Sequence, residues 1–211
     1  MLLRRFGVVT KISALTGAFW LILAGTSYAA TDTILPTGNY DPWCDEGQGS
    51  GTVCQTDNAD VYYYMDSSGA FELESGDRAV VVSMFTDQYS PTDLVRHYDS
   101  SPVFSGDGET DHIWQEGSEG FDADTVGMTW CNDSLLFSYR CDQHYIRIRG
   151  AGYIDLSTTC HEMGHAVGLL HGNLTSPKRN MNDHAALGCM VANDYEDDLG
   201  SNNVNGINSV Y

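Results

Sequence analysis

Basic residues are scarce in this chain. Lysine and arginine together number 10 of 211 residues, against 29 aspartates and glutamates, which gives a formal net charge of −19. All of the acidic residues follow residue 29, while three of the basic ones precede it, so the chain after residue 29 is more acidic still. A surface of this charge repels polyanions, which argues against binding of nucleic acid or of anionic membranes.

Long apolar runs are also rare. The one clear run covers residues 12–24, which is short for a membrane span, and no second run follows it. It comes after a basic start and before small residues at the two positions that a signal peptidase reads, Ser27 and Ala29. We therefore predict that residues 1–29 are a secretory signal peptide, with a membrane anchor as the alternative. The basic start consists of Arg4, Arg5 and Lys11.

Cysteines in a Cys-x-x-Cys arrangement are absent, which argues against a thiolate metal site. The six cysteines are an even number, which fits disulfides formed in an oxidising compartment. Together with the signal peptide they predict a secreted, extracellular protein. Residues 30–211 contain no repeat, low-complexity tract or clear linker, and their length suits one compact domain with its own core.

Residues 161–171, His-Glu-Met-Gly-His-Ala-Val-Gly-Leu-Leu-His, carry most of the chemical information. On a helix, His161 and His165 lie on one face, one turn apart, where they can share a metal ion. Glu162 lies beside them, where a general base for a metal-bound water would have to be. Gly168 lets the chain leave the helix, so His171 can return as a third ligand. Three neutral imidazoles with one open position are typical of a catalytic zinc site.

This segment resembles the metzincin zinc-endopeptidase signature, His-Glu-x-x-His-x-x-Gly-x-x-His, and matches all five defining positions. Residues 204–211, Val-Asn-Gly-Ile-Asn-Ser-Val-Tyr, are similar to the last helix of matrixin catalytic domains. The resemblance is therefore to the matrixin-like branch, in a small secreted form. Two features depart from relatives: Ala192 stands where astacins and serralysins carry a metal-approaching tyrosine, and Cys44 lacks the surroundings of the matrixin cysteine switch.

The resemblance implies a secreted endopeptidase that uses one zinc ion. His161, His165 and His171 would hold the ion, and Glu162 would act as general base toward a zinc-bound water that attacks the peptide bond. A methionine turn is expected beneath the histidines. Met190 is favoured over Met181 because Leu-Gly-Cys precedes it, which suits a turn. Residues 110–117 are expected to supply a cleft-edge strand that pairs with extended substrate. The residues after the methionine turn are expected to line the substrate pocket: Val191, Ala192 and Asn193.

Sequence alone allows about 15 pairings of six cysteines. Local closeness and the resemblance together favour Cys44 with Cys54, Cys131 with Cys141, and Cys160 with Cys189. The last pair would clamp the zinc helix to the floor of the site.

Matrixins often use calcium, so acidic groups near residues 107–111, 119–124 and 194–198 are candidate Ca²⁺ sites. None has EF-hand spacing, and solvated acidic loops are the alternative. We expect a monomer that acts on protein or peptide substrates, without nucleic-acid partners and without stable membrane insertion. The other histidines, expected at the surface or in strands, are His97, His112, His144 and His184.

Residue patterns predict an α+β domain. Strands are expected at 61–65, 94–98, 112–115, 127–130 and 145–149, and helices at 76–88 and 156–170. The second helix would be capped by Asp155 or Ser157. The resemblance refines this to a metzincin-like zincin fold: a twisted mixed sheet with two or three main helices, the zinc helix at a cleft, and an irregular lower subdomain.

Two other functions stay open. One is a non-catalytic secreted binding module that keeps the zincin fold. The other is a zinc hydrolase that acts on something other than peptides. Glu162 argues against the binding module, because a metal site without chemistry needs no base at that position.

Overall fold

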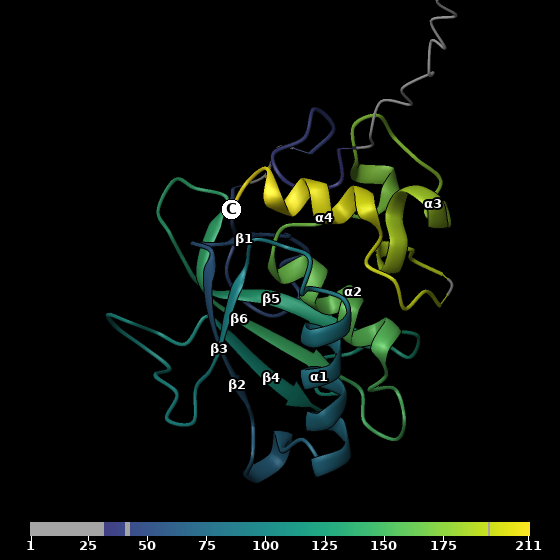
Figure 1. Cartoon of the computed structure of the whole chain (residues 1–211). Helices are drawn as coiled ribbons and strands as arrows, with labels where there is room; N and C mark the ends of the chain where they lie inside the picture. Colours follow the sequence, from purple (N-terminus) through teal and green to yellow (C-terminus); the bar gives the residue numbers. More distant parts are fainter. Residues whose placement is uncertain (1–31, 41–42, 194) are drawn as a thin grey trace, which may run out of the picture.

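The computed structural model describes residues 32–40, 43–193 and 195–211, which form a mixed sheet with helices packed against it (Figure 1). The predicted signal peptide lies outside the described residues. The predicted α+β class is confirmed. Figure 1 shows α3 and α4 gathered at one end of the molecule, beyond α2, with strands β2, β3 and β4 toward the other end.

The sheet has the order β1-β6-β4-β2-β3, all parallel, and β5 pairs with β6 in the antiparallel sense. The strands are β1 (Gln55–Thr56), β2 (Asp60–Met65), β3 (Val95–Tyr98), β4 (His112–Glu116), β5 (Gly127–Ser134) and β6 (Arg140–Ile148). The helices are α1 (Ser75–Asp87), α2 (Leu156–Ala166), α3 (His184–Leu187) and α4 (Ser201–Asn208). Short 3-10 turns are η1 (Gly69–Phe71), η2 (Gly172–Leu174) and η3 (Gly188–Met190).

Alternation along β2 shows which face of the sheet is the core face. Val61, Tyr63 and Met65 are buried in the main hydrophobic cluster, whereas Tyr62 between them is exposed. Helices α1 and α2 supply the other side of this cluster, and Tyr89, two residues after the end of α1, donates its hydroxyl to the Cys160 carbonyl of α2 at 2.9 Å. The sheet therefore serves as a rigid floor that positions α2.

Helix α2 ends at Ala166, four residues before the predicted end. Val167 is its C-cap, and Gly168 adopts φ +93°, a left-handed conformation that few other residues tolerate. Leu169 and Leu170 are still buried, but on non-helical chain, where the Leu170 amide donates to the Thr33 carbonyl at 2.7 Å. The helix was predicted to continue to Leu170 because both residues are apolar, but an apolar residue can be buried in a loop as well as in a helix.

The prediction that residues 110–117 form the cleft edge is wrong. These residues contain β4, which has β6 on one side and β2 on the other, so its backbone groups are already paired. The strand that lies beside α2 at the border of the sheet is β5. On the side of β5 away from β6, Glu46 forms an isolated bridge with Cys131.

Three disulfides are present, and they are the pairs that the sequence analysis favours: Cys44–Cys54, Cys131–Cys141 and Cys160–Cys189. The first two pack against each other and fasten the N-terminal loop to the start of the β5–β6 hairpin. The third joins α2 to η3. Disulfides of this number are typical of proteins from oxidising compartments. Within the described part of the chain, no helix has the length and apolar character needed to cross a membrane.

Two of the remaining histidines lie in strands as expected but are not at the surface. His112 and His144 are register partners in β4 and β6, both are buried, and neither ring nitrogen of His112 has a hydrogen-bond partner. Burial lowers the pKa of both imidazoles, that of His144 to about 3, so both are neutral in the folded protein.

Carboxylates crowd at one end of the sheet. Asp57, Asp111 and Asp142 bring oxygen atoms within 4.8 Å of one another, so together they could hold a cation. Asp111 belongs to the acidic group at 107–111, which the sequence analysis names as a candidate calcium site. Asp111 is buried and its Oδ2 accepts the Tyr62 amide at 2.5 Å. Burial, and then the charges of Asp57 and Asp142, raise its pKa to about 7.

Substituting Asp111→Asn is expected to stabilise the protein at pH 8 and to have a much smaller effect at about pH 4. The folded-state pKa is above the ordinary value, so stability is lost progressively as the pH rises from the ordinary value to about 7, and the loss is complete above that pH. The amide oxygen still accepts the Tyr62 amide. We expect a gain on the order of 2 kcal/mol at pH 8, measured by denaturant unfolding in EDTA. An equal effect at both pH values would contradict the assignment, and a parallel series in calcium shows whether the cluster takes a cation.

Candidate metal centre

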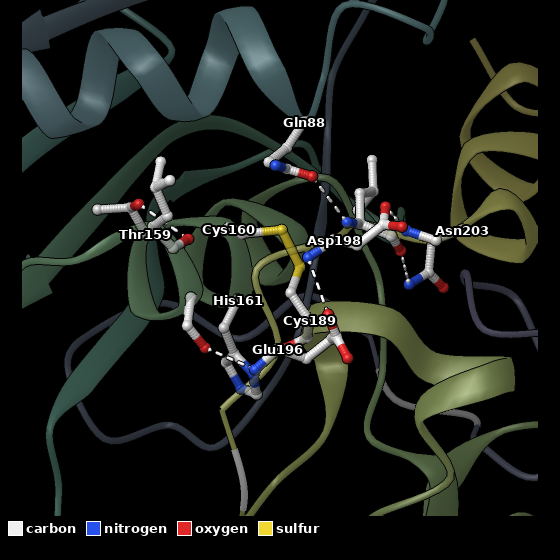
Figure 2. The surroundings of a disulfide bond; sticks show 12 residues. Gln88, Thr159, Cys160, His161, Cys189, Glu196, Asp198 and Asn203 are labelled. Atoms are coloured by element: carbon white, nitrogen blue, oxygen red, sulfur yellow. Dashed lines mark hydrogen bonds between the residues drawn. A yellow bond between two sulfur atoms is a disulfide. The ribbon is translucent and has the colours of Figure 1, made fainter.

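The helix that carries the first two histidines starts at a fixed point. Asp155 is the N-cap of α2, and its carboxylate accepts the Thr158 amide at 2.8 Å. Of the two predicted caps, Asp155 is therefore the one used. Figure 2 shows the disulfide from Cys160 to Cys189, with His161 next to it on the helix. The start of α2 is thus held from both its cap and its side.

The segment below the helix is held just as firmly. The Cys189 amide donates to the Asp198 carbonyl at 2.8 Å. The buried Asn203 side chain donates to the carbonyls of Leu187 and Leu199 at 2.6 and 2.7 Å, so α4 anchors the chain on both sides of η3 (Figure 2). This scaffold fixes Cys189, whose carbonyl oxygen lies 2.7 Å from His161 Nδ1.

The three predicted histidines meet at one point. The Nε2 atom of His161 lies 2.9 Å from that of His171 and 3.1 Å from that of His165, and the Nε2 atoms of His165 and His171 are 3.2 Å apart. Four-coordinate zinc with Zn–N bonds near 2.0–2.1 Å requires its ligand nitrogens to lie about 3.3 Å apart. The spacing of the three nitrogens therefore fits a small tetrahedral ion.

Hydrogen bonds at the far side of two rings determine the tautomer. His161 Nδ1 lies 2.7 Å from the Cys189 carbonyl oxygen, and His165 Nδ1 lies 2.9 Å from that of Leu169. A carbonyl only accepts, so each Nδ1 carries the hydrogen and each Nε2 presents a lone pair. Burial is the main cause that lowers the pKa of all three imidazoles, that of His161 to about 4. Lone pairs that face one another repel, whereas a cation between them is bound by all three.

Met190 lies directly beneath the histidine-bearing helix. It is buried, and its Sδ lies 2.2 Å from the position that a Cβ on Gly164 would take. Only glycine at 164 lets the thioether pack this close to the turn that carries His165. Met181, the alternative, is less buried, and its carbonyl accepts the Ala192 amide at 2.9 Å. Met190 therefore packs against the turn of α2 that carries His165, and its assignment to a methionine turn stays a prediction.

Glu162 lies in the same cleft as the histidines, against β5. The Thr129 hydroxyl is 2.8 Å from its Oε2 and 2.9 Å from its main-chain carbonyl oxygen. Burial raises the pKa of the carboxyl to about 7, and the bond from Thr129 partly offsets that rise. No sequence motif marks Thr129, because it is 33 residues from Glu162 and meets it only through packing of β5 on α2.

The cleft around these residues has a volume of about 630 Å³. Val191, Ala192 and Asn193 line it, as the sequence predicts. The N-terminal loop at residues 51–53 and Tyr195 also line it, and no sequence motif marks either of them.

The other candidate ligands do not join this centre. His97 stacks on Tyr62 with ring centroids 4.6 Å apart, and His184 Nδ1 lies 3.2 Å from a Glu196 oxygen. Among the described residues, Cys44, Cys54 and Cys131 form another group of three potential metal ligands. All three sulfurs are in disulfides, so the group presents no thiolate.

The chain matches no model of a known protein family, and no curated protein matches it. The metzincin resemblance therefore stays a prediction that rests on residues 161–171 and 204–211.

Proposed function

We propose that this protein is a secreted zinc-dependent endopeptidase of the matrixin-like metzincin type. The observation that carries the proposal is the convergence of three neutral imidazole nitrogens, 2.9–3.2 Å apart, next to the buried Glu162 carboxylate in a cleft. Three histidines with one remaining position are typical of a catalytic zinc site, whereas structural zinc sites are closed by four protein ligands. Zinc held there supplies a Lewis acid that polarises a carbonyl group and makes water more acidic.

Glu162 performs the proton transfers. As water adds to the scissile carbonyl carbon, one of its protons passes to the carboxylate, and the C–N bond then breaks as that proton is delivered to the leaving nitrogen. Burial raises the pKa of this carboxyl above its ordinary value, which makes it a better proton acceptor than an exposed carboxylate. His161, His165 and His171 do not move protons here, because their Nε2 lone pairs are the metal-binding groups and two of their Nδ1 hydrogens are held by carbonyls.

The free edge of β5 provides a place for extended substrate. The His144 amide donates to Asp111 on the β4 side, so its antiparallel partner Cys131 presents its backbone groups to the opposite, open side. The Cys131 carbonyl indeed accepts the Gly47 amide there at 2.8 Å. By alternation Thr129 and Gly127 face the same side, where a peptide can pair with them by strand addition.

Removal of the metal tests the proposal. The protein recovered from an expressing culture should cleave an unfolded protein such as casein, lose that activity in a chelator, and regain it with stoichiometric zinc. His171→Ala is expected to lower the affinity for zinc at least 100-fold, because one of three ligands is lost. His97→Ala, which removes a distant histidine, is the matched control and should match the wild type. Zinc-loaded wild type that cleaves no peptide bond would contradict the proposal and favour a binding module.

A further inference from the structure

Two residues of β5 meet the two oxygens of the Glu162 carboxylate. Gly127 and Thr129 are two positions apart in the strand, so they lie on the same face. A Cβ on Gly127 would lie 2.5 Å from Oε1, and the Thr129 hydroxyl lies 2.8 Å from Oε2. The two carboxylate oxygens therefore contact neighbouring positions on one face of the strand, Oε1 at Gly127 and Oε2 at Thr129.

Gly127 contributes room. The position of a Cβ there is also 2.7 Å from both Cδ and Cγ of Glu162, so any other residue would overlap three atoms of the side chain. These atoms are not the loose end of an exposed chain, because Glu162 is only 5% exposed. A larger residue at 127 has to push the carboxylate off the strand.

Thr129 contributes direction. Its hydroxyl has a single hydrogen and two acceptors on Glu162, Oε2 at 2.8 Å and the main-chain carbonyl oxygen at 2.9 Å. Because Thr is branched at Cβ, its χ1 has few choices, and the hydroxyl stays where it can reach both oxygens. A glutamate side chain has several rotatable bonds, and without this hydroxyl it would populate many rotamers.

We infer that Gly127 and Thr129 form a cradle that positions Glu162, and that the same two residues set the register of the substrate. The side chain of Thr129 holds the carboxylate while its backbone groups face the open edge of β5. Because Thr129 both pairs with the peptide and holds the carboxylate, it fixes the position of the peptide relative to the base. Thr129 is a positioning residue in this account, and the inference rests on the proposed endopeptidase function.

Kinetics separate this role from general stability. Thr129→Val keeps the shape and the backbone pairing but removes the hydroxyl, so kcat should fall about 10- to 100-fold while KM stays within about twofold. Thr129→Ser restores the hydroxyl and should recover most of kcat. Thr86→Val removes an exposed hydroxyl in α1 that bonds only its own helix, and should behave as the wild type. Equal kcat for Thr129→Val and the wild type would overturn the cradle.

A second readout does not depend on activity. The chain contains eight glutamates, so carboxyl-¹³C-labelled glutamate gives a simple spectrum, and Glu162→Gln identifies the Glu162 signal by its disappearance. That signal should shift or broaden in Thr129→Val, but not in Thr129→Ser or Thr86→Val. An unchanged signal in Thr129→Val overturns the cradle. If the signal shifts in Thr129→Val while the wild type takes up zinc yet cleaves no peptide, the cradle is supported and the endopeptidase proposal is contradicted, so the two failures are distinguishable.

Discussion

Glu162→Gln is expected to lower peptide hydrolysis by about 10²- to 10⁴-fold without loss of bound zinc, the range typical of removing a general acid–base group. Glutamine keeps the size of the side chain and can still accept the Thr129 hydroxyl through its amide oxygen. It cannot take up the proton that peptide hydrolysis must move. The three histidines are untouched, so the loss should lie in kcat.

The measurement is the rate of cleavage of a quenched fluorescent peptide, with zinc content determined on the same sample. Glu72→Gln is the matched control, since Glu72 is an exposed glutamate outside the cleft and should leave both quantities unchanged. A Glu162→Gln protein that keeps its activity would rule out this carboxylate as the base. A protein that loses its zinc would show that Glu162 acts on the metal site instead.

Removing the Cys160–Cys189 disulfide is expected to have the largest effect on stability. The bond closes 29 residues of chain, for which loop closure accounts for about 3–4 kcal/mol. It is also the covalent link between the helix with His161 and the carbonyl of Cys189 that orients that ring. Cys160→Ala with Cys189→Ala should therefore lower both the melting temperature, by roughly 10 °C, and the affinity for zinc.

Removal of Cys44–Cys54 is the matched control for this experiment. That bond spans 10 residues, so its loss should cost about 1 kcal/mol less, and its sulfurs pack against Cys131 and Cys141 rather than against the histidines. Calorimetry with and without zinc distinguishes the two. If both double variants lost stability equally and kept equal zinc affinity, the Cys160–Cys189 bond would have no special role in holding the site.

The parts of the site that the sequence could predict are local. His161, Glu162 and His165 follow from the period of a helix, and Gly168 and His171 from how that helix ends. The interactions that complete the site could not be predicted, because they join distant segments. The Cys189 carbonyl behind His161 and the hydroxyl of Thr129 beside Glu162 are 28 and 33 residues away.

The error over residues 110–117 has the same origin. Alternation and β-propensity indicate that a segment is a strand, but not which neighbours it has. β4 is central only because β2 and β6 both pair with it, and that order is a property of the whole sheet. The early end of α2 could not be predicted either, since the apolar residues 169 and 170 remain buried after the helix has ended.

Titration of the metal-free protein with zinc, while cleavage of a quenched peptide is followed, tests the central claim most directly. If His161, His165 and His171 hold one catalytic ion, the rate should rise in proportion to added zinc and level off at one equivalent. His171→Ala should need far more zinc to reach any activity. If zinc binding saturates at one equivalent but no peptide is cleaved, the proposed function is contradicted. If zinc does not bind stoichiometrically, the metal centre itself is contradicted.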